Sequence, residues 1–483
     1  MKTRQIITLL LAAAMLCALV AACGGSSSPS GSGASPSDQP GVRDRYETTR
    51  EILVGIWWMN DIRFTSDRKD YSLENATNQY NAQLQWDAIT AVENLYNIKF
   101  NMVDMTFDGA RESIFTSIAA GTPDVDIYCL DPQFLLTPIR NNYCLALEDF
   151  LPADHDIFND MLVMNSMKLM GQDKTYVFAP TPLMDQNNNG GGMMGFNWTL
   201  LQERGVTENP QDLYDRGEWT WNNWIEMMRT ITSPAENVWG WSGGHEQSFI
   251  RFLFSNNAYV ASGPTQTLNS PATLEVLQLI YDLYNTWNLA KPWDNEVDYW
   301  DMQAWNKRDL GFFYFVPWLA QDTRPWGTSM SEQCPDEIRT VPFPIGPVAQ
   351  SEGLKAYANV ADSNMYMIPT GTKDPEVVLD VFYRYLHWWG DDTTLRDDVD
   401  WIKDLMYEFV DDRPGEDPLR GFDYLTEMLT MPGFEMWKML QIRDEERDAG
   451  FGIGAILDGS NTPAQFAEQW QGIVQTYLDA VFK

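Results

Sequence analysis

The chain has 483 residues, 44% of them apolar, and its 68 acidic residues against 33 basic ones give a formal charge of −35. So acidic a protein repels nucleic acid and anionic lipid headgroups, which excludes a nucleic-acid partner. The chain is longer than a domain with a single hydrophobic core usually is, and its length suits two domains.

The first 22 residues are typical of a secretory signal peptide. Lys2 and Arg4 precede an apolar run that is too short to span a bilayer. Small residues then lead into Cys23, and 24–41 is almost all Gly, Ser and Pro, which makes a flexible tether. The pattern resembles the lipobox of bacterial lipoproteins, which implies that Cys23 carries a lipid. A plain signal peptide with a chance cysteine, or a transmembrane anchor, is the alternative.

The next region alternates between strand and helix patterns. Strands are expected at 51–58, 98–102 and 125–130, and helices at 82–96 and 110–120. This order predicts an α/β fold with a mainly parallel, doubly wound sheet, whose ligands lie beyond the carboxyl ends of the strands. The side chains placed at such ends are Trp57, Trp58, Asn60 and Asp131.

A polar, glycine-rich stretch at 186–192 separates this region from a second patterned one. There a strand is expected at 310–315, before Trp318, and helices are expected to start near Thr220, Pro271, Asp374 and Thr462. Thr462, Pro463 and Gln465 form the pattern of a capping box. Residues 391–448 are acidic and largely helical in pattern.

The cysteines and histidines do not indicate a metal site. Cys129, Cys144 and Cys334 remain in the mature body, and either a Cys129–Cys144 disulfide or three buried thiols fits the sequence. There is no Cys-x-x-Cys pair, and the three histidines are far apart. Residues 185–190 imitate half of a calcium loop, but Phe196 stands where its bidentate Glu would be. We expect no metal and no cofactor.

Six short motifs resemble those of the extracellular solute-binding proteins of ABC importers, in the sugar-type family 1. They follow one another in the family's order: 119–125 (AAGTPDV), 145–151 (LALEDFL), 195–205 (GFNWTLLQERG), 218–221 (EWTW), 304–318 (AWNKRDLGFFYFVPW) and 342–347 (PFPIGP). The chain departs from the family pattern at Phe196, where Tyr is usual, and at Arg308-Asp309, which replace a glycine-containing turn.

The resemblance implies a two-lobed periplasmic-binding-protein fold (type II-like). Each lobe would be a mainly parallel sheet flanked by helices, and hinge strands near 192–196 and 357–362 would join them. The boundaries expected are 1–22 for the signal peptide, 23–46 for the lipidated cysteine and tether, 47–192 plus about 362–440 for lobe 1, and 193–358 plus about 441–483 for lobe 2.

The resemblance also implies a role. The chain would be the substrate-binding lipoprotein of an ABC importer rather than an enzyme. It would be a monomer held by its lipid at the outer face of the bacterial cell membrane. It would close on a sugar or oligosaccharide and deliver it to the transmembrane subunits of the permease.

Twenty tryptophans fit a carbohydrate ligand, because indole rings cover the apolar faces of sugars while carboxylates and amides bind the hydroxyl groups. Most of the twenty must be core residues. The candidate ligand-binding residues are Trp57, Trp58, Asn60, Asp131, Asn197, Trp241, His245, Glu246, Trp318 and Asn364. For Asp131 a loop-capping role is an equal alternative, and 241–246 could be a plain surface loop.

Two other functions stay open at this point. A lipid-anchored glycoside hydrolase needs two carboxylates across the sugar bond, such as Asp131 and Glu246, but no motif selects that pair. A sensory protein that presents its ligand to a membrane receptor kinase would share the fold and the site.

Overall fold

The computed structural model describes most of the chain beyond the tether. The described residues are 46–57, 79–131, 134–158, 163–164, 174–180, 192–293, 308–315, 336–354, 365–386, 394, 420–421, 423–424 and 452–482. The signal peptide, Cys23 and nearly all of the tether lie outside these ranges. Among the described helices, none is both long and apolar enough to cross a membrane.

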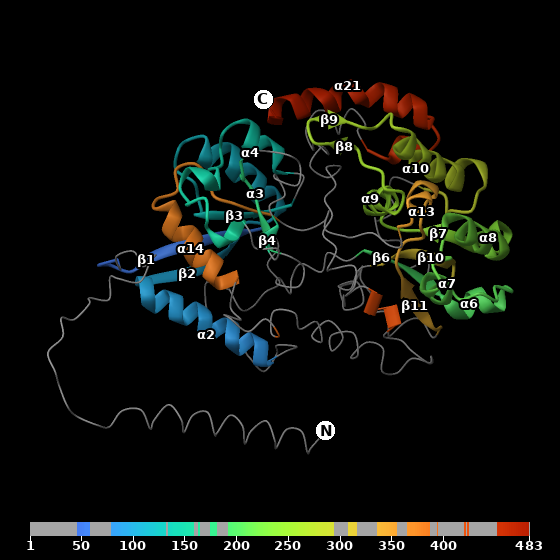
Figure 1. The fold of residues 1–483 in the computed structure, drawn as a ribbon, viewed down its shortest axis with the longest axis horizontal. Coiled ribbons are helices and arrows are strands. Elements are labelled where there is room, and N and C mark those ends of the chain that lie inside the picture. The colour runs from blue at the N-terminus through green and yellow to red at the C-terminus, as the bar shows by residue number, and fades with distance from the viewer. Residues whose placement is uncertain are drawn as a thin grey trace, which may run out of the picture. The chain divides into compact units, whose positions relative to one another are not determined.

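The first sheet has four strands in the order β12-β3-β1-β2 (Figure 1). They are β1 (Arg50–Ile56), β2 (Ile98–Asp104), β3 (Ile127–Leu130) and β12 (Met365–Met367). β1 pairs in parallel with β2 and β3, and β12 is antiparallel to β3. The strands expected from the sequence at 51–58, 98–102 and 125–130 are thus present in a mainly parallel sheet.

Both faces of the first sheet are buried, as parallel sheets require. Successive side chains of a strand point to opposite faces. In β3, Ile127 and Cys129 therefore pack with α2 (Gln79–Tyr96) and α14 (Pro375–Leu386), while Tyr128 and Leu130 pack with the other core cluster, which includes residues of α3 and η5. The remaining elements around this sheet are α3 (Phe107–Ser113), η5 (Ile114–Ile118), α4 (Leu136–Arg140), η7 (Leu147–Asp149), η8 (Asp156–Phe158), β4 (Val163–Met164) and β5 (Ala179–Pro180).

The second sheet also has four strands, in the order β11-β6-β10-β7. They are β6 (Met193–Asn197), β7 (Trp239–Ser242), β10 (Leu310–Phe315) and β11 (Ile338–Val341). β7 and β10 are parallel, but β6 is antiparallel to both β10 and β11. β7, β10 and β11 therefore run in one direction, and only β6 of these four strands runs against them, because it begins at the edge where β7 and β10 end.

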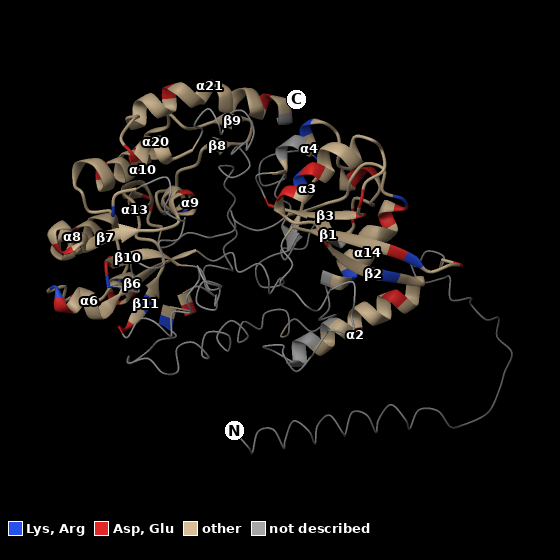
Figure 2. Cartoon of the chain, turned by 180° about the vertical axis from the view of Figure 1, so that it is seen from behind, with Lys and Arg blue, Asp and Glu red and all other residues tan. Residues whose placement is uncertain are grey.

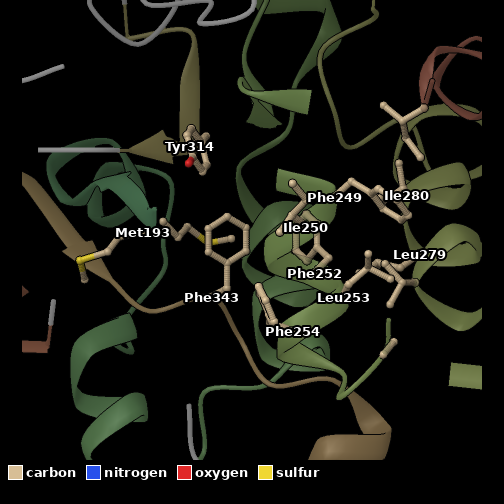
Figure 3. Packing of buried hydrophobic residues seen from close by; sticks show 14 of the residues in the cluster. Met193, Phe249, Ile250, Phe252, Leu253, Phe254, Leu279, Ile280, Tyr314 and Phe343 are labelled. Atoms are coloured by element: carbon tan, nitrogen blue, oxygen red, sulfur yellow. The ribbon is translucent and has the colours of Figure 1, made fainter. Parts of the chain in front are cut away.

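Helices surround the second sheet, and α9 (His245–Ser255) is the most enclosed of them, with every side chain from Gln247 to Ser255 buried (Figure 3). The others are α6 (Trp198–Glu203), α7 (Pro210–Asp215), α8 (Trp221–Ile231), η9 (Pro234–Glu236), α10 (Pro271–Tyr281), η10 (Asp282–Thr286), α13 (Pro347–Ser351), α20 (Gly454–Leu457) and α21 (Pro463–Phe482). A short hairpin, β8 (Ala261–Ser262) and β9 (Thr265–Gln266), completes the set.

Local sequence explains several helix ends. Thr220 caps α8, and its hydroxyl accepts a hydrogen bond from the backbone N–H of Asn223. At the start of α21 the backbone N–H of Thr462 donates to Gln465 Oε1 over 2.9 Å, and the N–H of Gln465 donates back to Thr462 Oγ1 over 3.4 Å. The predicted capping box is therefore confirmed.

Residues 420–424 differ from the lobe assignment made from sequence. Arg420 donates to Asp212 Oδ1 of α7 over 2.7 Å and also pairs with Asp215, and the Tyr424 ring lies edge-on to Tyr214 at 4.6 Å. A Cβ on Gly421 would lie 1.9 Å from Thr340 Oγ1 of β11. This segment thus packs with the second sheet, although 362–440 was expected in lobe 1. The ion pairs of Arg420 and the aromatic contact of Tyr424 hold the segment there, and the local sequence pattern does not predict such contacts.

Cys129 and Cys144 are both free thiols and both buried, so the disulfide considered from the sequence does not form between them. Burial raises the pKa of Cys144 to about 12, which keeps this thiol protonated and unreactive at neutral pH. Cys334 and the calcium-like 185–190 stretch lie outside the described residues. The part of the chain that the structure describes contains no group of three His, Cys, Asp or Glu suited to a metal ion.

Candidate ligand-binding site

The carboxyl ends of three parallel strands meet at one edge of the first sheet. Ile56 of β1 pairs with Asp104 of β2 and with Cys129 of β3, so Trp57, Phe107 and Asp131 follow strands that end together. We call these three residues and Phe134 the first rim. In a doubly wound sheet this edge is where ligands bind.

The first rim is aromatic. The Trp57 indole meets the Phe107 ring edge-on, with centroids 5.2 Å apart, and Phe107 lies 4.6 Å from Phe134. Trp57 is only partly buried, so its neighbours fix the orientation of the ring while part of its surface remains accessible. Trp58 and Asn60, the other two residues expected at this strand end, lie outside the described residues.

Asp131 lies at the same edge, directly after β3, with 7% of its surface exposed. Its backbone carbonyl accepts a hydrogen bond from the N–H of Phe134 over 3.0 Å, which turns the chain back under the rim. The predicted place of Asp131 at a strand end is what the structure shows. Its role toward a ligand stays a prediction.

A second rim lies at one edge of the second sheet. Phe313 of β10 pairs with Ser242 at the end of β7, and Phe315 pairs with Met193 at the start of the antiparallel β6. The chain segments at this edge carry Gly192, Gly244, His245, Glu246 and Tyr314, which we call the second rim.

Two glycines of the second rim are required by the Tyr314 side chain. Gly244 has φ +53°, and a Cβ there would lie 2.6 Å from the Tyr314 ring. A Cβ on Gly192 would lie 2.5 Å from both the Tyr314 hydroxyl and Nε of Arg251. Tyr314 and the almost fully buried Arg251 therefore pack directly against bare backbone (Figure 3 shows Tyr314 beside the core).

His245, the first residue of α9, completes an aromatic group. Its ring lies 6.0 Å from Tyr284 and 6.3 Å from Trp293. Its side chain is partly buried. The glycine-rich stretch was expected to be a loop, whereas the structure places Trp241 in β7 and His245 in α9. The contact of His245 with a ligand remains a prediction.

Glu246 contacts a segment that is distant in sequence, and its contact with a ligand remains a prediction. Its Oε1 accepts the backbone N–H of Ile453 over 3.1 Å, and a Cβ on Gly452 would lie 3.1 Å from the same oxygen. The carboxylate thus fixes 452–453 against the first turn of α9. We interpret Glu246 as a positioning residue of the second rim.

Trp241 and Asn197 lie inside the protein. Trp241 is 2% exposed and is packed among Trp224, Phe252 and Phe343 at 5.5–6.0 Å. Its indole has no face left for a sugar, so the expected ligand contact is corrected to a core role.

Asn197 is fully buried and lies at the carboxyl end of β6. Because β6 runs against its neighbours, this end is at the edge of the sheet opposite the second rim. The side chain caps α6 by accepting the N–H of Leu200 over 2.9 Å, and it donates to Asp336 over 2.7 Å. The expected ligand role of Asn197 is therefore corrected to a structural one.

Trp318 and Asn364 lie outside the described residues, so their predicted roles remain untested. No sequence motif pointed to Phe107, Tyr284, Trp293, Tyr314 or Arg251. For Tyr314 a signal existed, since it is the penultimate residue of a correctly predicted strand. For the others, the positions come from contacts between segments that are distant in sequence.

No protein-family model matches the sequence. Solved structures do match over the whole fold. An ABC substrate-binding protein from Listeria monocytogenes in complex with cycloalternan has 15% identity and a TM-score of 0.52, with 90% of this chain and 98% of that one covered. The GacH receptor of Streptomyces glaucescens, solved unliganded and with acarbose, has 14% identity, a TM-score of 0.53, and coverage of 90% and 99%.

A cyclo/maltodextrin-binding protein complexed with maltotetraose has 11% identity, a TM-score of 0.53, and coverage of 90% and 98%. The chain has the periplasmic-binding-protein fold. At these identities the likeness concerns the fold, and it covers nearly the full length of the compared proteins. In this fold the two rims are the strand-end surfaces of the two sheets, which makes them the candidate site.

Proposed function

We propose that this protein is the substrate-binding lipoprotein of an ABC importer, which captures a sugar or oligosaccharide between its two rims. The observation that carries the proposal is the aromatic character of both rims at the ligand edge of this fold. Trp57 and Phe107 on one rim, and His245 with its aromatic neighbours on the other, suit the apolar faces of sugar rings.

Capture requires a change in population between open and closed forms. The ligand must bind the closed form better, since a ligand with equal affinity for both shifts nothing. The closed form is then what the permease recognises, and release needs no bond to be made or broken. No cofactor enters this account, and the protein acts as a carrier rather than an enzyme.

A saccharide screen tests the proposal. Thermal-shift measurements over mono- and oligosaccharides should find at least one that raises the melting temperature, because a ligand that binds only the folded form stabilises it. Small-angle scattering with that sugar should show a smaller radius of gyration, and the sugar should be recovered intact. A panel without any stabilising saccharide, or a cleaved product, would contradict the proposal.

The anchor is a separate part of the proposal. The leader, Cys23 and the tether support attachment by lipid at the outer face of the bacterial cell membrane. Cells fed a labelled fatty acid should label the wild-type protein, and Cys23→Ala should remove the label. Label retained in Cys23→Ala would refute the anchor and leave the sugar site untouched.

A further inference from the structure

Residues of α8, α10 and α13 line a surface pocket. Figure 1 labels these three helices around the second sheet. The pocket shares no residue with either rim. Its volume of about 200 Å³ is room for about seven water molecules, and hence for a single sugar ring. We call it the α10 pocket.

The floor of the α10 pocket is apolar and rigid. It is formed by side chains that are buried or partly buried, and these are Trp221, Ile225, Leu279, Trp287 and Ile345. Arg229 holds the Trp287 ring by a cation–π contact of 5.4 Å, and the Trp221 indole donates to Ser255 over 3.2 Å. Both indoles are therefore fixed before any ligand arrives, which lowers the entropy cost of binding.

The border of the pocket is polar. Exposed amides from each of the three helices, Asn222, Gln278 and Gln350, surround the floor. None of these amides makes a side-chain hydrogen bond to another described residue, so their donors and acceptors are available to a ligand. An apolar floor with an amide border is the arrangement that binds the face and the hydroxyls of a sugar.

Two carboxylates add selectivity. Glu275 Oε2 accepts a hydrogen bond from Asn256 over 3.0 Å, and Asp282 Oδ1 accepts one from Thr286 over 2.6 Å. The second oxygen of each accepts none from the described part of the chain. None of the described residues that line the pocket is Lys or Arg. Anionic ligands are thus repelled, and neutral hydroxyl donors are favoured.

We propose that the α10 pocket is a second, low-affinity site for a short neutral saccharide. It goes beyond the proposed function, because it is separate from the rims and its chemistry stands on its own. Such a site would hold part of a longer glycan, or a second copy of the ligand, on the outside of the helices.

Methyl NMR reads the pocket directly. In protein labelled with ¹³C at the isoleucine δ1 methyl groups, maltotriose or cellotriose should shift the signals of Ile225 and Ile345 in a saturable, millimolar titration. Asn222→Trp places a bulky side chain at the border of the pocket and should lower the saccharide affinity measured at these methyl groups by about tenfold or more. Thr230→Trp, at an exposed position of the same helix outside the pocket, is the matched control and should leave the saccharide affinity unchanged.

A milder variant, Gln278→Ala with Gln350→Ala, removes border amides without adding bulk and should also weaken the titration. If saccharides shift methyl groups elsewhere while Ile225 and Ile345 stay still, the second site is refuted and the proposed function stands. Equal saccharide affinities at Ile225 and Ile345 in Asn222→Trp and Thr230→Trp would refute the second site as well. If the pocket responds but no sugar binds at the rims, the second site stands and the proposed function falls.

Discussion

At the scale of single residues, the second rim depends on backbone that only glycine can supply. Gly244 precedes α9 in a left-handed conformation, and the Tyr314 ring fills the space where a Cβ would be. Gly217 is also left-handed, with φ +72°, but nothing lies within 4 Å of its Cβ position. A substitution at Gly217 therefore has only the energetic cost of the left-handed dihedral angle, whereas one at Gly244 has this cost and that of a steric clash.

Gly244→Ala should therefore be much more destabilising than Gly217→Ala. A left-handed alanine costs about 1–2 kcal/mol, which is all that Gly217→Ala should lose. Gly244→Ala should lose about 2–5 kcal/mol, since overpacking against Tyr314 adds to the strain. Urea unfolding measures both values. Equal losses in the two variants would show that Tyr314 does not fill the space above Gly244.

The residue roles that sequence predicted wrongly have definite causes. Asn197 lies directly before helix α6, and Asn is a preferred residue at the N-cap, so the sequence could have indicated its capping role. Trp241 is in a glycine-rich segment near a strand end, and only its contacts with Trp224 and Phe252 show that it is core. The hydrogen bond from the Ile453 N–H to Glu246 joins residues that are over two hundred positions apart, and the sequence did not predict it either. Local patterns do not contain such contacts.

At the scale of elements, the α2 helix is tied to α14 by one buried hydrogen bond. Tyr96, the last residue of α2, is 1% exposed and donates its hydroxyl to Asp380. Burial, followed by this hydrogen bond and the negative charge of Asp380, raises the pKa of Tyr96 from its ordinary value near 10 to about 12.

A raised folded-state pKa sets the pH dependence. The stabilisation from the protonated phenol is fully present below pH 10 and is lost as pH rises toward 12. Tyr96→Phe should be about 1 kcal/mol less stable than the wild type at neutral pH, and the gap should narrow above pH 10. Urea unfolding across this range measures the gap, with Tyr281→Phe on α10 as control. A gap that stays constant to pH 12 would contradict the assignment.

Most regular elements were predictable because their determinants are local. The buried strand at 310–315 and the capping box at 462–465 were found with their bounds. The helix expected at 110–120 is instead α3 followed by the wider turns of η5, a division that tertiary packing imposes. The direction of β6 also escaped prediction, since strand pairing in the second sheet depends on where the chain enters it.

At the scale of the whole molecule, the chain combines an acidic surface with apolar, aromatic strand ends. Figure 2 shows acidic residues spread over the helices around both sheets, with fewer basic ones. This distribution keeps the protein soluble and away from polyanions, and it favours a neutral ligand at the rims. The ion pair of Arg420 with α7 shows that the chain has returned to the second sheet at this residue, after α14.

The central claim is that a sugar is bound at the rims, and calorimetric titration of Trp57→Ala tests it most directly. With a saccharide that binds the wild type, Trp57→Ala should lose about tenfold in affinity, or ~1.4 kcal/mol, because the exposed part of its indole is lost. The control is Trp239→Ala, another partly buried indole, at the end of β7 opposite the second rim, which should bind as the wild type does. Unchanged affinity in Trp57→Ala would contradict the account.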